Sequence, residues 1–366
     1  MNQHKLDPNL KVGIFIPTMN RSEFIVRQLN YYAFLDCPHT IYIGDSSNQE
    51  HSDKTRKAIN DLGDRIKVIY EYSPSLGGIE TIRHLLSIIK EPYTCFSGDD
   101  DYQISDSLTK SAEFLENNQD YATAGGYAVS FRLKGHGVYG NLDRLADYPR
   151  LYINSDTARE RVVKYLERYY VPLFLVNRTK DMLRYFGKEN EIKDKSFEGE
   201  IIPSTLSIIA GKSAILDCLG FIRQIHDSHL AIPNVFDWII QPIWLESYEK
   251  FERIISEAIS KRDGISYSEA RETTRLAFWS YLQMWLAKDY KNALLKKGSD
   301  KSENSQIKNI RNLIKTKLPL VRATYRGLKP FFSRRRYLHN EVLQKNSKYY
   351  TDFKLVMDSF TGQIKP

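Results

Sequence analysis

Short apolar runs alternate with amphipathic stretches over the first 130 residues. Four apolar runs predict buried strands, at residues 12–17, 40–44, 66–70 and 93–96. The stretches between them repeat apolar positions with the period of a helix, at residues 23–35, at 53–62 and up to residue 89. Strands that alternate with helices at this spacing form a parallel sheet with right-handed crossovers and helices on both faces. The pattern therefore predicts an α/β fold of the Rossmann-like kind.

The pattern is less regular in the rest of the chain. Residues 105–117 predict a helix, and residues 122–129 predict a further strand. Residues 131–200 are rich in Tyr, Arg and Gly and have no clear period before a helical stretch at 156–170, which is typical of variable loops. Residues 247–295 are helical, and their apolar faces predict packing against the α/β part. We therefore expect a mostly parallel sheet with a helical C-terminal extension.

Three carboxylates follow the fourth predicted strand directly. Asp99, Asp100 and Asp101 come after a break at Ser97-Gly98, at the end of the strand where open α/β sheets bind their ligands. Carboxylate oxygens suit Mg²⁺ or Mn²⁺, and such an ion is commonly completed by waters and substrate phosphates. The alternative is a solvated acidic turn. We interpret the triplet as a metal and diphosphate site in which Asp99 and Asp101 bind the metal, because alternation along an extended chain points Asp100 away from its neighbours.

Polar residues also follow the other three predicted strands. The carboxyl ends of parallel strands lie at one edge of a sheet, so these residues should converge on the Asp triplet. Asp45 could accept hydrogen bonds from a ribose or a base, or it could cap the next turn. The pair Gly77-Gly78 could admit a nucleotide closely, or it could form an ordinary turn. The residues expected to converge are Asn20, Arg21, Asp45, Ser46, Ser73, Gly77 and Gly78.

Composition narrows the class of protein. With 366 residues, of which 42% are hydrophobic, the chain can bury a substantial core. No run approaches the roughly 20 apolar residues of a membrane span, no signal peptide opens the sequence, and the three Cys residues are too scattered for a disulfide framework or a zinc site. These features predict a cytoplasmic protein. His226 and His229 lack further Cys or His ligands nearby, so we interpret them as surface or acceptor-site residues.

Four motifs occur in the order Ile16-Pro17-Thr18-Met19-Asn20-Arg21, Gly44-Asp45-Ser46-Ser47, Leu76-Gly77-Gly78 ahead of Arg83, and Asp99-Asp100-Asp101. This series resembles the nucleotide-binding half of a family 2 glycosyltransferase of the A-type fold. The resemblance implies an inverting transfer of a sugar from a nucleotide-sugar donor, UDP-linked, with Mg²⁺ or Mn²⁺ on the Asp-x-Asp motif. It implies a donor site made of Pro17, Thr18, Asn20, Arg21, Asp45, Ser46, Ser73, Gly77, Gly78, Arg83, Asp99 and Asp100.

The resemblance also suggests how the chain is divided. We expect a nucleotide-sugar-binding half at residues 11–130 and an acceptor-side half at residues 131–247. A helical packing segment at residues 248–298 should follow them. Residues 305–366 then form a basic amphipathic C-terminal region.

Inverting sugar transfer needs a base that takes the proton from the attacking hydroxyl. Three acceptor-side carboxylates compete for this role, namely Asp237, Asp227 and Glu200. We favour Asp237, because Phe236 and Trp238 flank it and apolar surroundings raise the pKa of a carboxyl group toward that of a useful base. Asp237 could instead cap a helix that starts at Trp238.

The basic character of the chain is concentrated near its C-terminus. The formal net charge is +8, and residues 288–348 contain 17 basic and 4 acidic side chains. An apolar stripe from Ile307 to Leu318 is interleaved with basic residues, and the cluster Arg334-Arg335-Arg336 follows it. A basic amphipathic segment favours an anionic membrane surface. We therefore expect a peripheral enzyme at the inner face of a bacterial plasma membrane, which acts on a polysaccharide or lipid-linked glycan acceptor in capsule or lipopolysaccharide synthesis.

Two other functions remain open from the sequence. A nucleotidyl- or phosphosugar transferase could use the same nucleotide and metal site. A non-enzymatic protein on a degenerate fold could use the C-terminal charge to bind a polyanion. We expect no nucleic-acid partner, because no recognised nucleic-acid-binding module accompanies the charge.

Overall fold

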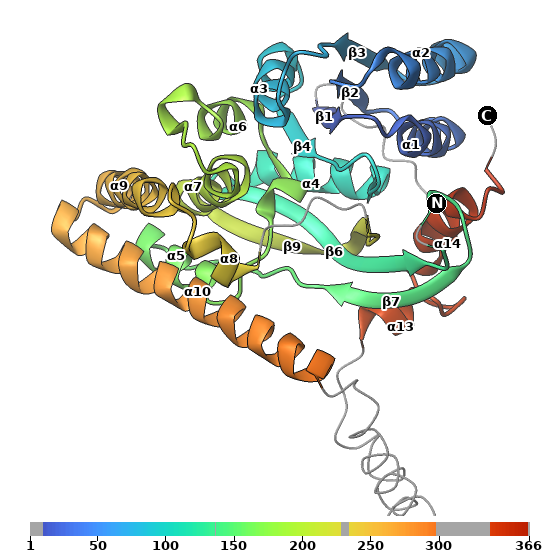
Figure 1. Cartoon of the computed structure of the whole chain (residues 1–366). Coiled ribbons are helices and arrows are strands. Elements are labelled where there is room, and N and C mark those ends of the chain that lie inside the picture. The colour runs from blue at the N-terminus through green and yellow to red at the C-terminus, as the bar shows by residue number, and fades with distance from the viewer. Residues whose placement is uncertain (1–9, 136, 228–233, 298–336, 365–366) are drawn as a thin grey trace, which may run out of the picture.

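The computed structural model describes residues 10–135, 137–227, 234–297 and 337–364. A nine-stranded sheet runs through this part of the chain, in the order β3-β2-β1-β4-β8-β6-β9-β5, with β7 paired to β6 (Figure 1). The strands are β1 (Val12–Thr18), β2 (Thr40–Asp45), β3 (Val68–Tyr72), β4 (Tyr93–Phe96), β5 (Tyr102–Gln103), β6 (Tyr121–Leu133), β7 (Leu142–Tyr148), β8 (Val176–Arg178) and β9 (Lys212–Gln224).

The first four strands form the predicted parallel half of the sheet. Strand β1 pairs with β2 on one side and with β4 on the other, and β3 extends the sheet beyond β2. Their bounds agree with the predicted strands to within two residues. The second half is mixed: β8 runs antiparallel to both β4 and β6, while β6 and β9 are parallel to each other. Because two antiparallel steps restore the direction, β4, β6 and β9 end at the same edge of the sheet.

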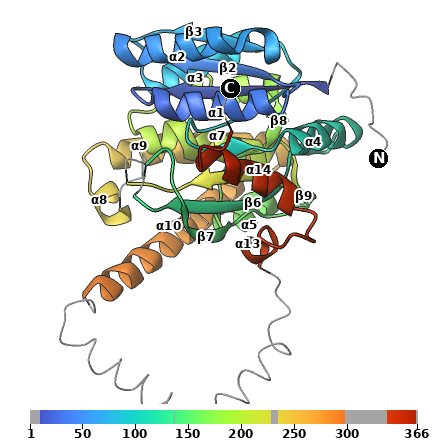
Figure 2. The same cartoon turned by 90° about the vertical axis from the view of Figure 1, so that its right-hand side faces the viewer.

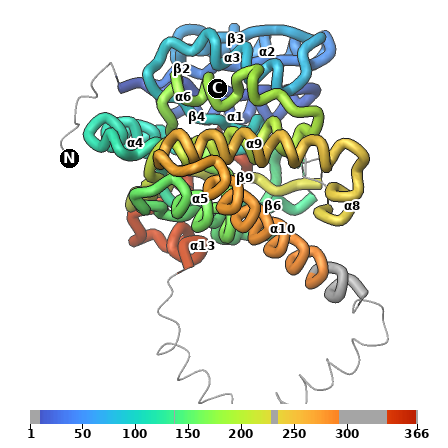
Figure 3. Tube along the Cα trace, turned by 90° about the vertical axis from the view of Figure 1, so that its left-hand side faces the viewer, coloured from blue at the N-terminus to red at the C-terminus, as the bar shows by residue number. Residues whose placement is uncertain are grey.

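Helices cover both faces of the sheet, as Figures 2 and 3 show from opposite sides. The predicted α/β class with a helical C-terminal part is confirmed. The helices are α1 (Ser22–Phe34), α2 (Gln49–Leu62), α3 (Gly78–Ile88), α4 (Ser105–Asn117), α5 (Ala158–Leu166), α6 (Thr179–Tyr185), α7 (Ile202–Ala210), α8 (Val235–Ile239), α9 (Trp244–Asp263), α10 (Tyr267–Lys297), α13 (Leu338–Glu341) and α14 (Tyr350–Phe360).

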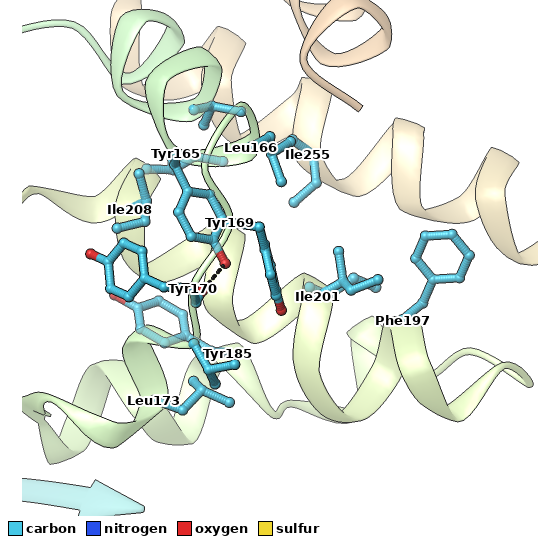
Figure 4. Packing of buried hydrophobic residues seen from close by; sticks show 14 of the residues in the cluster. Tyr165, Leu166, Tyr169, Tyr170, Leu173, Tyr185, Phe197, Ile201, Ile208 and Ile255 are labelled. Atoms are coloured by element: carbon cyan, nitrogen blue, oxygen red, sulfur yellow. Dashed lines mark hydrogen bonds between the residues drawn. The ribbon is translucent and has the colours of Figure 1, made fainter. Parts of the chain in front are cut away.

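Two hydrophobic cores lie on the two faces of the sheet. Alternation along β1 places Ile14 and Ile16 in one core, with α1, α4 and α14, and Phe15 in the other, with α3, α5, α7, α9 and α10. The second of these cores is rich in tyrosine. Figure 4 shows Tyr165, whose hydroxyl donates to the carbonyl of Tyr170 at 3.1 Å, so a buried polar atom is satisfied inside the packing.

The C-terminal residues return to the first half of the chain. Helix α14 contacts α1 (Figure 2), and Phe353, Val356 and Phe360 are fully buried. The expectation that residues 305–366 form one basic amphipathic region is therefore wrong for residues 337–364, where the apolar spacing of α14 serves a core. Residues 305–336, which include the Ile307 to Leu318 stripe and the Arg334-Arg335-Arg336 cluster, lie outside the described residues.

Within the described ranges, no helix combines the length and the hydrophobicity that a membrane crossing requires.

Candidate active site

The ends of β1 and β4 bring the first loop against the Asp triplet. The two strands pair in register up to Phe15 and Phe96, and the amide of Ser97 donates to the carbonyl of Phe15 at 3.0 Å. The chain therefore continues past both strands side by side. As a result, the hydroxyl of Thr18 donates to Oδ2 of Asp99 at 2.8 Å. The ends of β1 and β4 therefore lie together, as the sequence predicted.

All three aspartates are buried. Asp99, Asp100 and Asp101 are 5%, 3% and 2% exposed, so this is not a solvated acidic turn. Burial, together with the charge of Asp100, raises the pKa of Asp99 to about 7 and the pKa of Asp101 well above its usual value. Three carboxylates packed this closely need positive charge nearby.

Arg21 supplies part of that charge. Its Nη1 lies 3.0 Å from Oδ1 of Asp99 and its Nη2 lies 2.7 Å from Oδ2 of Asp100. Burial lowers the pKa of the guanidinium, but the charges of Asp99 and Asp100 outweigh this effect and raise it. Arg21 is thus a cation held across two carboxylates, and it is 22% exposed toward the surface of the site.

The backbone of the triplet is held by buried donors on α1. The Gln28 amide donates to the carbonyls of Gly98 at 2.9 Å and Asp101 at 2.7 Å, and Nη2 of Arg27 donates to the carbonyl of Asp100 at 2.8 Å. A Cβ on Gly98 would lie only 2.7 Å from Oδ1 of Asp100 and 2.8 Å from Oδ2 of Asp101. Any side chain at this position would displace the carboxylates of Asp100 and Asp101 from their places.

His226, which the sequence suggested as a surface or acceptor-site residue, is buried against the Asp triplet. Its Nε2 lies 2.8 Å from Oδ2 of Asp100 and 2.9 Å from Nη2 of Arg21, and its ring stacks on Phe24. The signal that would have found it is the alternation of residues 212–224, which predicts strand β9. Since β9 is parallel to β6 and ends at the edge where Asp99 lies, the residues that follow it reach the triplet.

The end of β9 also contacts Asp101. The amide of Gln224 donates to Oδ1 of Asp101 at 3.1 Å. The neighbouring Arg223 donates to the hydroxyl of Tyr148 at 3.0 Å. Burial lowers the pKa of Arg223, whereas the charges of Tyr148, Asp101 and Glu200 raise it, with a net increase. Arg223 therefore lies within electrostatic reach of both Asp101 and Glu200.

The carboxylate oxygens of the triplet fit Mg²⁺ or Mn²⁺ bound in a site that the protein does not fully enclose. Among the described residues, no three His, Cys, Asp or Glu side chains converge to enclose a metal. These ions are commonly bound by one or two carboxylates, with waters and phosphates as the other ligands. A divalent cation would also favour the ionised forms of Asp99 and Asp101, whose pKa values burial raises. Arg21 is the cation with which such an ion competes for Asp99.

The other predicted donor residues of the first two loops tie those loops together. Pro17 and Thr18 lie beside Gly44 and Asp45 in the register of β1 and β2. Asn20 has a left-handed backbone (φ 56°), its amide donates to Oγ of Ser47 at 2.7 Å, and its side chain accepts from the amide of Asn48 at 2.9 Å.

Asp45 caps the turn after β2, which was the alternative to binding a ribose or a base. Its side chain is fully buried, accepts from the amide of Ser47 at 2.8 Å and accepts from the hydroxyl of Tyr70 at 2.8 Å. The carboxylate of Asp45 is therefore engaged within the protein, and it orders the loop that carries Ser46.

The remaining predicted donor residues lie around the start of α3. Ser46 contacts Thr81 at 2.9 Å between their hydroxyl oxygens, which brings the first turns of α3 next to the β2 loop. The amide of Ser73 donates to the carbonyl of Asp45 at 2.9 Å. Gly77 caps α3 and Gly78 begins it, and both are exposed. Arg83 is engaged within the protein, since it donates to Glu198 at 2.7 Å and to the carbonyl of Phe186 at 2.8 Å.

A cavity of about 740 Å³ lies beside the end of β9, where Arg223 and Ile225 line it on either side of Gln224, the residue whose amide contacts Asp101. Arg223 and Glu200 line it, together with an aromatic wall. Glu200 belongs to a π-helical turn, Phe197–Ile201, and accepts a hydrogen bond from the hydroxyl of Tyr169 at 2.8 Å. The aromatic residues of the wall are Tyr148, Tyr169, Tyr170, Trp238, Tyr281 and Trp285.

The structure does not give Asp237 the environment that favoured it. Asp237 and Phe236 are both exposed, and only Trp238 is buried, so the carboxylate does not lie between two apolar rings. The helix begins at Val235, and the side chain of Asn234 caps it by accepting from the amide of Phe236 at 2.9 Å, so Asp237 does not cap a helix either. Asp227 is also exposed and pairs with Arg132 at 3.5 Å. Neither Asp237 nor Asp227 lines the cavity.

Comparisons with known proteins give distant similarities. Neither a protein-family model nor a curated protein sequence matches the chain. Among solved structures, the chain is similar to residues 1–349 of TarS from S. aureus, with 15% identity, a TM-score of 0.44 and coverage of 77% of this chain and 92% of that chain. A complex of that protein with UDP-GlcNAc matches with 14% identity, a TM-score of 0.41 and the same coverage.

A third similar structure is the mannosyltransferase PcManGT from Pyrobaculum calidifontis in complex with GDP-Man and Mn²⁺. It has 10% identity and a TM-score of 0.41, and the match covers 79% of each chain. At these identities and TM-scores, the similarities by themselves assign neither a family nor an activity to this chain.

Proposed function

We propose that this chain is a glycosyltransferase that moves a sugar, with inversion, from a nucleotide-sugar donor to a hydroxyl group of a glycan or lipid-linked glycan. The observation that carries the proposal is the position of two sites next to each other. A buried carboxylate cluster at the carboxyl ends of β1 and β4 lies near an aromatic cavity that contains Glu200, because Arg223 lines the cavity and is within electrostatic reach of Asp101. A donor diphosphate and an acceptor sugar need this pair of neighbouring sites.

The donor side would use the loops that follow β1, β2 and β3. Exposed amides at the start of α3 and the loop around Asn20 are available to a nucleotide, and Arg21 is the side-chain cation nearest the triplet. Asp99 and Asp101 are the residues that would hold Mg²⁺ or Mn²⁺, and the ion, when bound, would neutralise charge on the leaving diphosphate. A UDP-sugar is the donor that the four motifs imply.

The acceptor side would use the aromatic cavity. Sugar rings pack well on aromatic faces, and the wall of Tyr and Trp side chains offers several. Glu200 is then the base: its carboxylate takes the proton of the acceptor hydroxyl as the new bond to the anomeric carbon forms and the bond from that carbon to the diphosphate breaks. Of the three candidate carboxylates, Glu200 is the one that lines the cavity.

The cellular role is proposed on the sequence alone. Residues 305–336 carry the basic amphipathic stretch, so we place the enzyme at the inner face of a plasma membrane, in the synthesis of a cell-surface glycan. No nucleic-acid partner is part of the proposal.

A screen of nucleotide-sugars tests the proposed function. A true donor should raise the melting temperature of the full-length protein in the presence of Mn²⁺, because a ligand that binds only the folded state stabilises it. Slow hydrolysis of that donor to the free nucleoside diphosphate, without release of pyrophosphate, should accompany binding. Release of pyrophosphate would indicate a nucleotidyltransferase instead, and the absence of stabilisation by every donor would contradict the proposal.

A further inference from the structure

A second cavity lies at the opposite edge of the sheet from the Asp triplet. Its volume is about 1070 Å³, and it is formed by the start of β6, by α6, by the end of α7 and by α9. Arg178, which lines it, pairs in the sheet with Tyr93 at the start of β4, whereas Asp99 follows the end of the same strand. This cavity, which we call the α6–α9 groove, is therefore separate from the proposed sugar-transfer site. Figure 3 shows α6 and α9 on the same side of the molecule.

The α6–α9 groove is positively charged. Six basic and three acidic side chains line it. Two of the acids are already paired, Asp181 with Arg184 and Glu257 with Arg253. Within the described ranges, Lys180, Lys261 and Arg262 make no ion pair with the protein. The basic residues of the lining are Arg178, Lys180, Arg184, Arg253, Lys261 and Arg262.

A buried hydroxyl in the groove has no partner. Tyr185 is 5% exposed, and its hydroxyl makes no hydrogen bond with any described residue. Burial and the charge of Asp181 raise the pKa of Tyr185, while the nearby charges of Arg184, Arg178 and Arg262 lower it, with a net increase. The hydroxyl is therefore a protonated donor within electrostatic reach of three guanidinium groups. A buried donor of this kind calls for an acceptor atom.

The cation at the base of the groove is held in place. Arg178 donates to the carbonyls of Tyr121 at 2.6 Å and Leu115 at 2.7 Å, so its guanidinium is fixed before any ligand arrives. The groove also has an apolar part, made by Leu206, Ile209 and Ile254. It thus combines a fixed positive charge, a free donor and an apolar surface.

We propose that the α6–α9 groove binds a phosphate group, with its oxygens among Tyr185, Arg178 and Arg262 and the rest of the ligand on the apolar surface. Phosphate offers more acceptor oxygens than a carboxylate does, so it can accept from a tyrosine and from several guanidinium groups at once. Guanidinium forks match that geometry better than ammonium groups do. The phosphate could belong to a free anion or to a lipid headgroup, and both present the same chemistry.

Calorimetric titration of the full-length protein tests the proposal with three probes: inorganic phosphate, pyrophosphate and dihexanoyl phosphatidylglycerol. Arg262→Glu should weaken binding by about tenfold or more, because it reverses one charge at the phosphate. Tyr185→Phe removes one hydroxyl without changing the ring and should weaken binding by about three- to tenfold. Lys57→Glu, on the exposed face of α2, makes the same charge change elsewhere and should leave binding within about twofold.

The outcomes distinguish the sources of the phosphate. Binding of the free anions but not of the lipid would assign a soluble phosphate ligand, and binding of the lipid alone would assign a headgroup. Either result, with the predicted losses in both groove variants, supports the site. Binding that is equal in the wild type, Arg262→Glu and Tyr185→Phe would overturn it, as would the absence of binding of all three probes to the wild type. Nucleotide-sugar binding to the groove variants should be unchanged, which separates this site from the proposed donor site.

Discussion

Phe360 stacks on Phe131, with ring centroids 4.7 Å apart and an angle of 21° between the rings. This contact joins the last turn of α14 to the long strand β6. Both rings are buried, so the end of the chain completes a core that begins with β1.

Phe360→Ala should therefore destabilise the whole fold. Truncating a buried Phe removes apolar burial and leaves a cavity, at a cost of about 3–5 kcal/mol. Urea unfolding followed by circular dichroism would measure this loss. Leu343→Ala is the matched control, because Leu343 is 47% exposed and should change the unfolding free energy by less than about 0.5 kcal/mol. Equal stability of the two variants would show that α14 is dispensable.

The Asp triplet gives the second prediction. Asp99→Asn or Asp101→Asn should lower sugar transfer by about 10²-fold or more, because the site loses charge that a metal needs, and a metal supplies several kcal/mol of transition-state stabilisation. The melting temperature should stay the same or rise, since one of three crowded carboxylates is neutralised. Asp61→Asn, an exposed position on α2, is the control. Full activity in both site variants, or in excess EDTA, would remove the metal from the proposal.

Glu200→Gln gives the third prediction. Loss of general-base assistance should slow the chemical step by about 10²- to 10⁴-fold, with nucleotide affinity nearly unchanged. Single-turnover kinetics and a titration with the nucleotide separate the two effects. Asp227→Asn and Asp237→Asn are matched controls, because both carboxylates are exposed and lie outside the cavity. If either control shows the loss and Glu200→Gln does not, the base is on that residue instead.

Local patterns predicted the first half of the fold well. The apolar positions of strand β1 alternate between two buried faces, and its neighbours end in turn-forming residues. The hydrophobic period and the turn signals therefore predict the same strands. The meeting of Thr18 with Asp99 followed from the rule that parallel strands end at one edge. These features depend on residues close in sequence or on a general rule of sheet topology.

The structure of the acceptor side could not be predicted from local patterns, because it depends on contacts between residues far apart in the sequence. Strand β8 has only three residues, and its place between β4 and β6 is set by tertiary pairing. His226 reaches Asp100 because β9 ends at that edge, although 126 positions separate the two residues. Asp237 shows the opposite case: two neighbouring aromatic residues suggested burial, but helix α8 turns one ring inward and leaves Phe236 and the carboxylate in solvent.

Asp352 gives a prediction about pH. It lies on α14, where burial and the charge of Asp106 on α4 raise its pKa to about 6, while Lys110 partly offsets them. The folded state therefore binds this proton more tightly than the unfolded state, so the stability contribution is largest at low pH and is lost as the pH rises through 6. Asp352→Asn should raise the melting temperature by roughly 2 °C at pH 7.5, after allowance for solvent screening.

The difference between Asp352→Asn and the wild type should shrink as the pH falls and vanish near pH 4, where the aspartate is protonated in the folded protein. Melting curves from pH 4 to pH 8 would show this. A constant difference across the range would mean that the substitution acts through packing and not through charge.

The last prediction concerns the membrane. Residues 298–336 should bring the enzyme to anionic bilayers, because each basic side chain near such a surface contributes about 1 kcal/mol and the apolar stripe adds insertion. Truncation after Asp300 cannot test this, since it also removes the buried residues of α14. Replacement of residues 298–336 by a Gly/Ser linker of equal length keeps α14 in the chain.

The variant with this linker should no longer co-sediment with anionic vesicles, whereas the wild type should bind them less as salt increases. The triple variant Arg334→Glu, Arg335→Glu and Arg336→Glu should lose most of the same binding. Wild-type protein that binds anionic and neutral vesicles equally, or neither, would end the membrane proposal and leave a polyanionic acceptor as the partner of these arginines.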